Sequence, residues 1–456
     1  MHVPPEIFRQ YDVRGTVGEQ VTPALATALG QALARLAHDR LGHPPRLAVG
    51  RDNRPSGDAL ATAVANGVAA AGAVAVHVGM LPTPALYFAT QGGGIDGGVQ
   101  VTGSHNPPEY NGFKMVLGGR AVYGDDIQDL RRLIETERFK PSTGAISRDH
   151  TVLSRYVEEV VRRHLPAGRR LRVVVDCGNG VASLAAVRIL EPLGLEVIPL
   201  YCESDGTFPN HHPDPTVPEN LVALQESVRR NGAELGIAFD GDGDRIGLVD
   251  ENGRVIYGDQ ILILLGRDLV RRAGAGHTVI FDVKCSEVLP QELKRLGLEP
   301  LMWKTGHSLI KEKMRETGAP LAGEMSGHMF FAGDYFGYDD ALFAAARIAT
   351  YLASEGGPLS RHFAGLPQTV ATPELRVECP DDKKFEIVTA ASRHFGTRYP
   401  VNTLDGVRIT FEHGWGLLRA SNTQPALVLR FEASDERALD AAQAEVNSWL
   451  AGQGVG

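Results

Sequence analysis

The chain has 456 residues, more than one ordinary hydrophobic core can organise, so three or four domains are expected. Its 43% hydrophobic and 22% charged residues are typical of a globular protein and exclude a disordered chain. The formal net charge of −9, without a basic stripe, argues against a nucleic-acid partner but leaves room for a locally positive cleft that binds a small anion. No apolar run is long enough to cross a bilayer and the first ten residues lack a signal-peptide pattern, so we expect a cytoplasmic protein without a membrane partner.

The four cysteines are widely spaced along the sequence and form no C-x-x-C pair; they are Cys177, Cys202, Cys285 and Cys379. This spacing indicates neither a zinc site nor a disulfide framework. Reduced thiols in or near the core are expected.

Three similar units follow one another along the chain. Each begins with an apolar run that ends at an aspartate, at residues 46–52 (RLAVGRD), 171–176 (LRVVVD) and 278–282 (TVIFD). A helix-like stretch and a second apolar run come after each of them. This pattern predicts three βαβ units, each with a mostly parallel sheet covered by helices.

Each unit continues with another strand-like run that leads into a polar, glycine-rich loop. We call these the serine loop (residues 102–107, TGSHNP), the metal loop (residues 240–245, DGDGDR) and the sugar loop (residues 324–328, EMSGH). Because active-site loops of open α/β sheets gather at the carboxyl ends of strands, the three loops are expected to share one site.

The pattern changes after about Pro367. Alternating strand-like runs and two helix-like stretches predict a smaller α+β domain with a largely antiparallel sheet, which carries a fourth polar loop at residues 419–425 (RASNTQP), the phosphate loop. The predicted fold is therefore three similar mixed α/β domains and an α+β C-terminal domain around a central cleft. The predicted domain limits are 1–148, 149–253, 254–366 and 367–456.

Alternating carboxylates mark the metal loop. Asp240, Asp242 and Asp244 can turn their oxygens toward one hard cation, because the glycines between them permit a tight backbone. An EF-hand is disfavoured: its sixth position, which needs glycine, is Arg245, and the flanking segments read as strands. Three carboxylates this close repel one another unless a cation neutralises them, which favours a Mg²⁺ site.

Ser104 lies in the run TGSHNPPEYNGFKM, after an apolar strand and close in sequence to Lys114. It lacks the G-x-S-x-G elbow of a serine hydrolase. Its spacing alone leaves two interpretations open: an ordinary turn residue, or a nucleophile and phosphoryl donor beside a metal ion.

The sugar and phosphate loops offer ligands for different groups. Glu324 and Ser326 suit sugar hydroxyls, whereas the arginine, hydroxyl and amide groups of the phosphate loop suit a phosphate. Taken alone, each loop is better explained as a capping or surface-turn cluster. Tyr11 and Arg14, in the run QYDVRG, are equally ambiguous.

Taken together and in order, the motifs resemble those of the α-D-phosphohexomutases, and within them the bacterial phosphomannomutase/phosphoglucomutase group. The matching runs span almost the whole chain: YDVRG, TGSHNPPEYNGFKM, DGDGDR, WKTGHSLIK, GEMSGH and RASNTQP. The resemblance implies an intramolecular phosphotransferase that interconverts hexose 1-phosphate and hexose 6-phosphate, of mannose, glucose or both. A phosphoserine enzyme and a hexose 1,6-bisphosphate intermediate would carry the reaction. We expect phosphosugar substrates and a monomer or weak homodimer.

The resemblance also implies roles for the matching residues. Ser104 would carry the phosphoryl group. One Mg²⁺ would be bound by Ser104, Asp240, Asp242 and Asp244. Sugar hydroxyls would be contacted by Glu324 and Ser326, with His328 adjoining. The non-reacting phosphate would be held by Arg419, Ser421, Asn422 and Thr423. The cleft around the reacting phosphate or the sugar would be lined by Tyr11, Arg14, Lys114, Arg245, Lys284 and His307.

Two features of the mechanism stay open at this point. A base must deprotonate the attacking hydroxyl, and the sequence does not rank His307, Lys114 and His328. The bisphosphate must turn over between two half-reactions, which predicts a hinge of the C-terminal domain near residues 365–369.

Three rival functions are weighed against this one. A phosphoglucosamine mutase would share the motifs, although GEMSGH and WKTGHSLIK resemble the mannose/glucose group. A metal-dependent sugar phosphatase would use the same serine and aspartates but would need water at the phosphoserine. A non-catalytic sugar-phosphate sensor is disfavoured, because Ser104 and all three aspartates are present.

Overall fold

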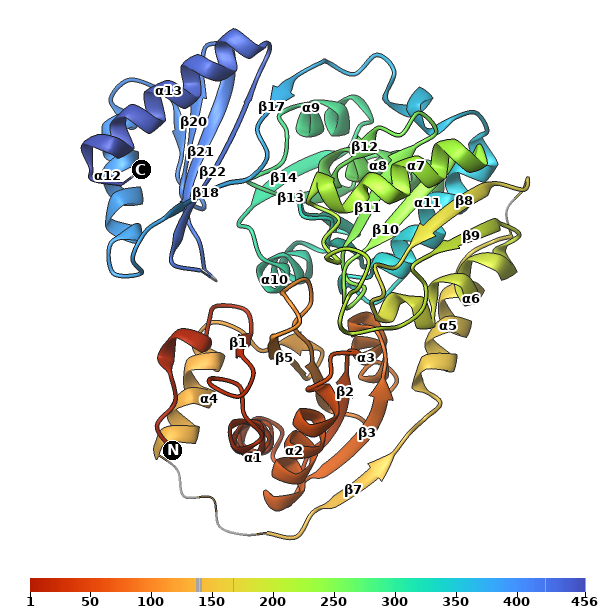
Figure 1. The fold of residues 1–456 in the computed structure, drawn as a ribbon, viewed down its shortest axis with the longest axis vertical. Coiled ribbons are helices and arrows are strands. Elements are labelled where there is room, and N and C mark those ends of the chain that lie inside the picture. Colours follow the sequence, from red (N-terminus) through yellow and green to blue (C-terminus); the bar gives the residue numbers. More distant parts are fainter. Residues whose placement is uncertain (137–138, 140–141, 167, 423, 456) are drawn as a thin grey trace.

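The computed structural model describes residues 1–136, 139, 142–166, 168–422 and 424–455. Four β-sheets follow one another along the chain. Figure 1 shows the first sheet and its helices in the lower half, the second and third above them, and the C-terminal sheet apart from these at the upper left. The predicted class, three similar α/β units and a smaller α+β unit, is confirmed.

The first sheet has the order β1-β5-β4-β2-β3-β7, with β6 paired to β5. β2 pairs in parallel with β3 and β4, whereas β5 runs antiparallel to β4 and β1. Its strands are β1 (Val13–Thr16), β2 (Arg46–Arg51), β3 (Val74–Met80), β4 (Gly97–Val101), β5 (Tyr110–Leu117), β6 (Arg120–Ala121) and β7 (Ala145–Arg148). Its helices are η1 (Pro5–Ile7), α1 (Pro23–Leu41), α2 (Gly57–Ala70), α3 (Thr83–Ala89) and α4 (Asp125–Thr136). Local chemistry fixes the ends of α1: the Thr22 side chain caps its first turn, and Gly42 ends it in the left-handed conformation.

The second sheet has the order β12-β11-β10-β8-β9, with β8 parallel to both β9 and β10. Its strands are β8 (Arg172–Asp176), β9 (Glu196–Leu200), β10 (Leu235–Phe239), β11 (Ile246–Asp250) and β12 (Val255–Ile256). Its helices are α5 (Val152–Arg162), η2 (Val181–Leu184), α6 (Ala186–Leu190), η3 (Glu191–Leu193), η4 (Pro218–Leu221) and α7 (Val222–Asn231).

The third sheet has the order β14-β13-β15-β16, with β13 parallel to β14 and β15. Its strands are β13 (Thr278–Asp282), β14 (Glu299–Trp303), β15 (Leu321–Gly323) and β16 (Met329–Phe331). Its helices are α8 (Gly258–Ala273), α9 (Val288–Arg295), α10 (His307–Thr317), α11 (Ala341–Glu355) and η5 (Leu359–Phe363).

The fourth sheet has the order β17-β22-β21-β20-β19, with β18 paired to β22, and its described pairings are all antiparallel. Its strands are β17 (Val370–Ala371), β18 (Leu375–Glu378), β19 (Val401–Asn402), β20 (Val407–Phe411), β21 (Gly414–Ala420) and β22 (Ala426–Ala433). Helices α12 (Lys384–Gly396) and α13 (Glu436–Gly452) pack against it. The four domain limits stay a prediction; β12 pairs with β11, so the second sheet extends past the limit expected at residue 253.

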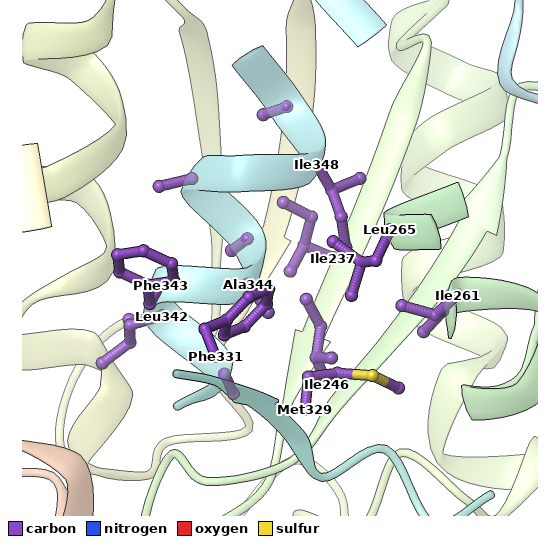
Figure 2. Packing of buried hydrophobic residues seen from close by; sticks show 14 of the residues in the cluster. Ile237, Ile246, Ile261, Leu265, Met329, Phe331, Leu342, Phe343, Ala344 and Ile348 are labelled. Carbon is purple, nitrogen blue, oxygen red and sulfur yellow. The ribbon is translucent and has the colours of Figure 1, made fainter. Parts of the chain in front are cut away.

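The second and third units share one hydrophobic core. Helix α11 is buried along most of its length, and Figure 2 shows Phe343 and Ile348 of this helix among Ile237, Ile246 and Phe331 of the two sheets. The first unit adds residues such as Ala85 and Tyr87 to this cluster and has a second cluster of its own. The fourth unit has its own cluster and meets the third unit at a small one formed by Val283, Trp415 and Leu417. No helix in the described ranges is both long and apolar enough to cross a membrane.

Candidate active site

The serine loop and the metal loop meet face to face, one after β4 and the other after β10. Ser104 is 1% exposed, and its hydroxyl donates a hydrogen bond of 2.8 Å to Oδ2 of Asp240. The backbones approach so closely that a Cβ on Gly241 would lie 2.4 Å from the carbonyl oxygen of Ser104. Glycine at position 241 is thus required for the two loops to meet.

The backbone of Ser104 is left-handed, with φ at 50°, a conformation that residues other than glycine seldom adopt. Its N–H donates to Oγ1 of Thr102 at 2.8 Å. The side chains of Ser104 and Asp240 are therefore brought together by a strained turn that its neighbours hold in place.

Asp52 and Arg54 hold that turn, and sequence analysis did not single out Arg54. Oδ2 of Asp52 accepts hydrogen bonds from the Thr102 hydroxyl (2.8 Å), the Gly103 N–H (3.1 Å) and Nε of Arg54 (3.1 Å). The Arg54 guanidinium, fully buried, donates to three carbonyls of the serine loop, those of Ser104, Asn106 and Pro107, and to that of Tyr110 at the start of β5. One buried ion pair thus satisfies three backbone acceptors of the serine loop.

The three aspartates of the metal loop form a cation-binding cluster. All are fully buried, and one oxygen from each lies within 4.8 Å of the others. Oδ1 of Asp240 accepts the N–H groups of residues 243, 244 and 245 at 3.0–3.1 Å, which orients this carboxylate. Oδ1 of Asp242 and Oδ1 of Asp244 have no hydrogen-bond partner among the described residues. Buried carboxylate oxygens left free in this way fit a hard cation such as Mg²⁺.

Lys114 is the cation that already touches this cluster. Its ammonium donates to Oδ2 of Asp242 at 2.8 Å and contacts Asp244. Burial disfavours the charged amine, but the carboxylates of Asp242, Asp244 and Asp240 outweigh it and raise the pKa of Lys114. Burial, together with the charges of Asp242 and Asp244, raises the pKa of Asp240 well above its usual range. The single positive charge of Lys114 is thus too small to balance the negative charge of the aspartate cluster.

A chain of side chains connects Arg245 to Asp339, which sequence analysis also missed. Nε of Arg245 donates to Nε2 of His328 at 3.0 Å, and Nδ1 of His328 lies 3.1 Å from Oδ2 of Asp339. Because arginine only donates, Nε2 of His328 is the acceptor and the ring proton is assigned to Nδ1, facing Asp339. Lys311 donates to the other carboxylate oxygen at 2.9 Å.

His307, the first residue of α10, lies in the same cluster. Its ring stacks on that of His328 at 5.6 Å between centroids, and its Nδ1 is 3.7 Å from Oδ2 of Asp339. Burial and the neighbouring charge of Lys311 lower the pKa of His307 well below its ordinary value.

Asp282, the last residue of β13, holds the sugar loop in place through hydrogen bonds. Its carboxylate accepts from the N–H of Met325 at 3.1 Å and from the Thr305 hydroxyl at 2.9 Å. Glu324 is buried, accepts the Gly306 N–H at 2.6 Å, and has a pKa raised by burial. Ser326, half-buried, lies in the same loop.

The phosphate loop contacts the N-terminal segment directly. Nδ2 of Asn422 donates to the Tyr11 hydroxyl at 2.7 Å, and that hydroxyl donates to the Thr305 carbonyl at 2.7 Å. Arg419 is paired with Asp405 at 3.1 Å. Buried Ser421 lies beside them, and Thr423 lies outside the described residues.

The two remaining predicted residues sit at the edges of this arrangement. Arg14 donates to Oδ1 of Asn106 in the serine loop at 2.7 Å. Lys284 is buried and pairs with Glu374 at 3.1 Å; burial disfavours its charge, but Glu374 outweighs that effect and raises its pKa. The structure therefore brings predicted residues from all four units close together.

A serine hydroxyl pressed against a buried triad of carboxylates, with arginine and lysine side chains around it, defines a metal-dependent phosphoryl-transfer enzyme. The comparison with known families is more specific. Models of phosphoglucomutase/phosphomannomutase alpha/beta/alpha domains I, II and III match residues 5–141, 154–253 and 257–370, and the model of the C-terminal domain matches 374–448. The chain belongs to the phosphoglucomutase/phosphomannomutase family.

Individual relatives match over nearly their whole length. The phosphomannomutase/phosphoglucomutase of Pseudomonas aeruginosa is 46% identical over 440 residues, which is 96% of this chain and 94% of that protein. The phosphoglucomutase of Neisseria gonorrhoeae is 43% identical and covers 96% of this chain and 95% of its own. The crystal structure of a family protein from Burkholderia thailandensis superposes with a TM-score of 0.90 at 43% identity, covering 98% of each chain.

Proposed function

We propose that this chain reversibly interconverts hexose 1-phosphate and hexose 6-phosphate, with mannose or glucose as the sugar, and that phosphorylated Ser104 starts the cycle. The observation that carries the proposal is the 2.8 Å contact between the Ser104 hydroxyl and Asp240, inside a carboxylate cluster with free oxygens. The proposal includes one Mg²⁺, a cytoplasmic location, and a monomer or weak homodimer.

The first half-reaction transfers the phosphoryl group from Ser104 to the free hydroxyl of the sugar. The bond from phosphorus to Oγ of Ser104 breaks as the bond from phosphorus to the sugar oxygen forms. When bound by Ser104, Asp240, Asp242 and Asp244, Mg²⁺ would neutralise charge on the transferring group. Arg245 and Lys114 add fixed positive charge beside it. The product is a hexose 1,6-bisphosphate. After this intermediate reorients, its other phosphoryl group is transferred back to Ser104.

We assign the role of general base to His328. Lys114 is held as a cation between two carboxylates, so it has no free lone pair to accept a proton. His328 presents Nδ1 to Asp339 and leaves Nε2 as its basic nitrogen. A sugar hydroxyl that replaces Arg245 at Nε2 would deliver its proton there, and Asp339 would stabilise the resulting imidazolium. His307 would then position the sugar.

The other site residues are proposed to bind. Glu324 and Ser326 would contact sugar hydroxyls, and Tyr11, Arg14 and Lys284 would line the cleft. The non-reacting phosphate would lie against Arg419, Ser421, Asn422 and Thr423. The burial of Ser104 disfavours a phosphatase, because attacking water would need free access to the phosphoserine.

The test combines intact-protein mass spectrometry with mutase assays on wild type, Ser104→Ala and, as a matched control, exposed Ser434→Ala. Wild type and the control should carry a phosphate-sized added mass and full activity, and Ser104→Ala should lack both. Full activity in Ser104→Ala would overturn the mechanism. Assays with glucose, mannose and glucosamine 1-phosphates test the substrate, and a clear preference for the amino sugar would favour the rival mutase, which one relative at 37% identity is named for.

A further inference from the structure

Two cysteines that the sequence separates by 25 positions lie side by side at the ends of neighbouring strands. Cys177 directly follows β8, and Cys202 comes two residues after β9. The strands pair in parallel with Asp176 opposite Leu200, and the Cys177 N–H donates to the Leu200 carbonyl at 3.2 Å. This places the two sulfur atoms 3.1 Å apart, joined by a sulfhydryl hydrogen bond.

The sulfur atoms of this pair are already close to bonding distance. In the register of β8 with β9, Asp176 lies opposite Leu200, so Cys202 is one position beyond the residue opposite Cys177. The sulfurs need only to approach by about 1 Å to reach the bond length of about 2.05 Å. Side-chain rotation and a small shift of Cys177 toward Cys202 would close this gap.

The two thiols differ in the way that a reactive pair requires. Cys177 is fully buried, whereas Cys202 is partly exposed and can meet a small oxidant. Because Cys202 is the member of the pair that solvent reaches, it is the thiol that meets the oxidant, and Cys177 is the thiol that resolves it.

We propose that Cys177 and Cys202 form a peroxide-reactive dithiol that closes reversibly to a disulfide. The Cys202 sulfur attacks hydrogen peroxide, the O–O bond breaks, and a sulfenic acid and one water form. The Cys177 sulfur then attacks the Cys202 sulfur, the S–O bond breaks, and the hydroxyl leaves with the thiol proton as a second water. Two thiols and one peroxide thus give one disulfide and two waters.

The pair is connected to the metal loop through the loop at residues 177–181. The Val181 N–H donates to the Gly241 carbonyl at 3.0 Å, and a Cβ on Gly180 would lie 2.7 Å from the same oxygen. Gly241 stands between Asp240 and Asp242. Asn179, between the cysteine and this contact, has a left-handed φ of 60°, so this loop has little freedom to absorb a displacement. A disulfide that draws Cys177 toward Cys202 should therefore disturb the metal loop. This consequence rests on the proposed function, whereas disulfide formation does not.

The first test reads the disulfide by mass. Full-length protein is treated with hydrogen peroxide, the excess is removed with catalase, free thiols are alkylated, and unreduced peptides are mapped. We expect a cross-linked pair of peptides containing Cys177 and Cys202, lost on treatment with dithiothreitol. Cys379→Ser, which removes a buried thiol of the fourth unit, should cross-link like wild type, and Cys202→Ser should not. Alkylation of both cysteines after peroxide in folded wild type would overturn the proposal, whatever the mutase activity.

The second test reads the metal loop. After peroxide treatment, wild type should need about tenfold more Mg²⁺ for half-maximal mutase activity, the size of effect seen when groups that orient metal ligands are disturbed. Cys202→Ser should keep its untreated Mg²⁺ dependence under the same treatment. A complete disulfide with an unchanged Mg²⁺ dependence would refute the connection to the metal loop. Absence of mutase activity in untreated wild type would instead refute the proposed function.

Discussion

The side-chain amide of Asn422 donates a hydrogen bond of 2.7 Å to the hydroxyl of Tyr11, which lies 411 positions earlier in the chain. An exposed ion pair between Arg9 and Asp381, at 3.0 Å, joins the same two units. The C-terminal unit thus closes on the N-terminal segment. A cavity of about 210 Å³ beside residues 366–369 leaves space next to the predicted hinge. The hinge itself stays a prediction.

We expect Tyr11→Phe and Asn422→Ala to weaken this closure. Asn422→Ala removes one hydrogen bond worth about 1 kcal/mol, so its KM for glucose 1-phosphate should rise about fivefold. Tyr11→Phe removes this bond and also the one from the Tyr11 hydroxyl to the Thr305 carbonyl, so its KM should rise at least as much. Because both variants remove the contact between Tyr11 and Asn422, the double variant should be little worse than Tyr11→Phe alone. Steady-state kinetics measure this, and small-angle scattering with and without the sugar phosphate should show a more open average shape. Fully additive effects on KM would show that the contact does not act in closure.

Lys114→Gln should make stability depend on added metal. It leaves two buried carboxylates without their cation, a change that costs about 3–5 kcal/mol. In a chelator, the thermal midpoint of Lys114→Gln should fall well below that of wild type, and Mg²⁺ should raise it by more than it raises wild type. Exposed Lys383→Gln is the control and should match wild type in both conditions. An equal Mg²⁺ response in Lys114→Gln and wild type would contradict a cation at the three aspartates.

Asp339→Asn should lower kcat while changing KM little. Asp339 accepts from Lys311 through one oxygen and faces His328 with the other. An amide has a single acceptor oxygen and cannot serve both, so His328 loses its orienting partner. We expect kcat to fall by about 10²-fold, within the range for general acid–base groups. His328→Ala should be at least as impaired, and exposed His413→Ala should be unaffected. A KM effect alone would assign Asp339 to binding.

Asp340 should make the protein less stable as the pH rises toward neutrality. Burial raises the pKa of this carboxyl to about 7, although it accepts hydrogen bonds from Tyr156, Tyr335 and the Phe343 N–H. Because the pKa of Asp340 is higher in the folded than in the unfolded chain, this carboxyl contributes fully to the free energy of unfolding below its unfolded pKa of about 4. The contribution is lost as the pH rises through the folded pKa of about 7. Asp340→Asn removes this titration. Its stability relative to wild type, from denaturant melts, should therefore be higher at pH 7.5 than at pH 4.5; a constant difference would refute the shift.

Much of the fold and site could be predicted because each unit repeats the same order of strand, helix, strand and loop. The aspartates that end the first strand of each unit were visible in the sequence, but their purpose was not. Asp52 holds the serine loop and Asp282 holds the sugar loop through backbone N–H groups and hydroxyls. Their targets lie far along the chain, so only the paired strands of the fold show which loop each carboxylate reaches.

Arg54, Asp339 and the cysteine pair could not be predicted for a related reason. Arg54 binds carbonyl groups, which carry no residue identity, and Asp339 lies in the run GYDD, outside every motif. Cys177 and Cys202 meet only because β8 and β9 are neighbours. Local spacing predicts motifs, whereas the partners that hold those motifs depend on strand order.

The ion pair between Arg419 and Asp405 has a consequence for turnover. Arg419 holds an internal counter-anion before any substrate arrives, and Asp405 also accepts the Thr305 N–H at 3.0 Å. A phosphate bound there as proposed would exchange one anionic partner of Arg419 for another, so its affinity would reflect a difference between two ion pairs. Under the proposed mechanism, in which the bisphosphate must leave and rebind in the opposite orientation, this anion exchange would favour its release.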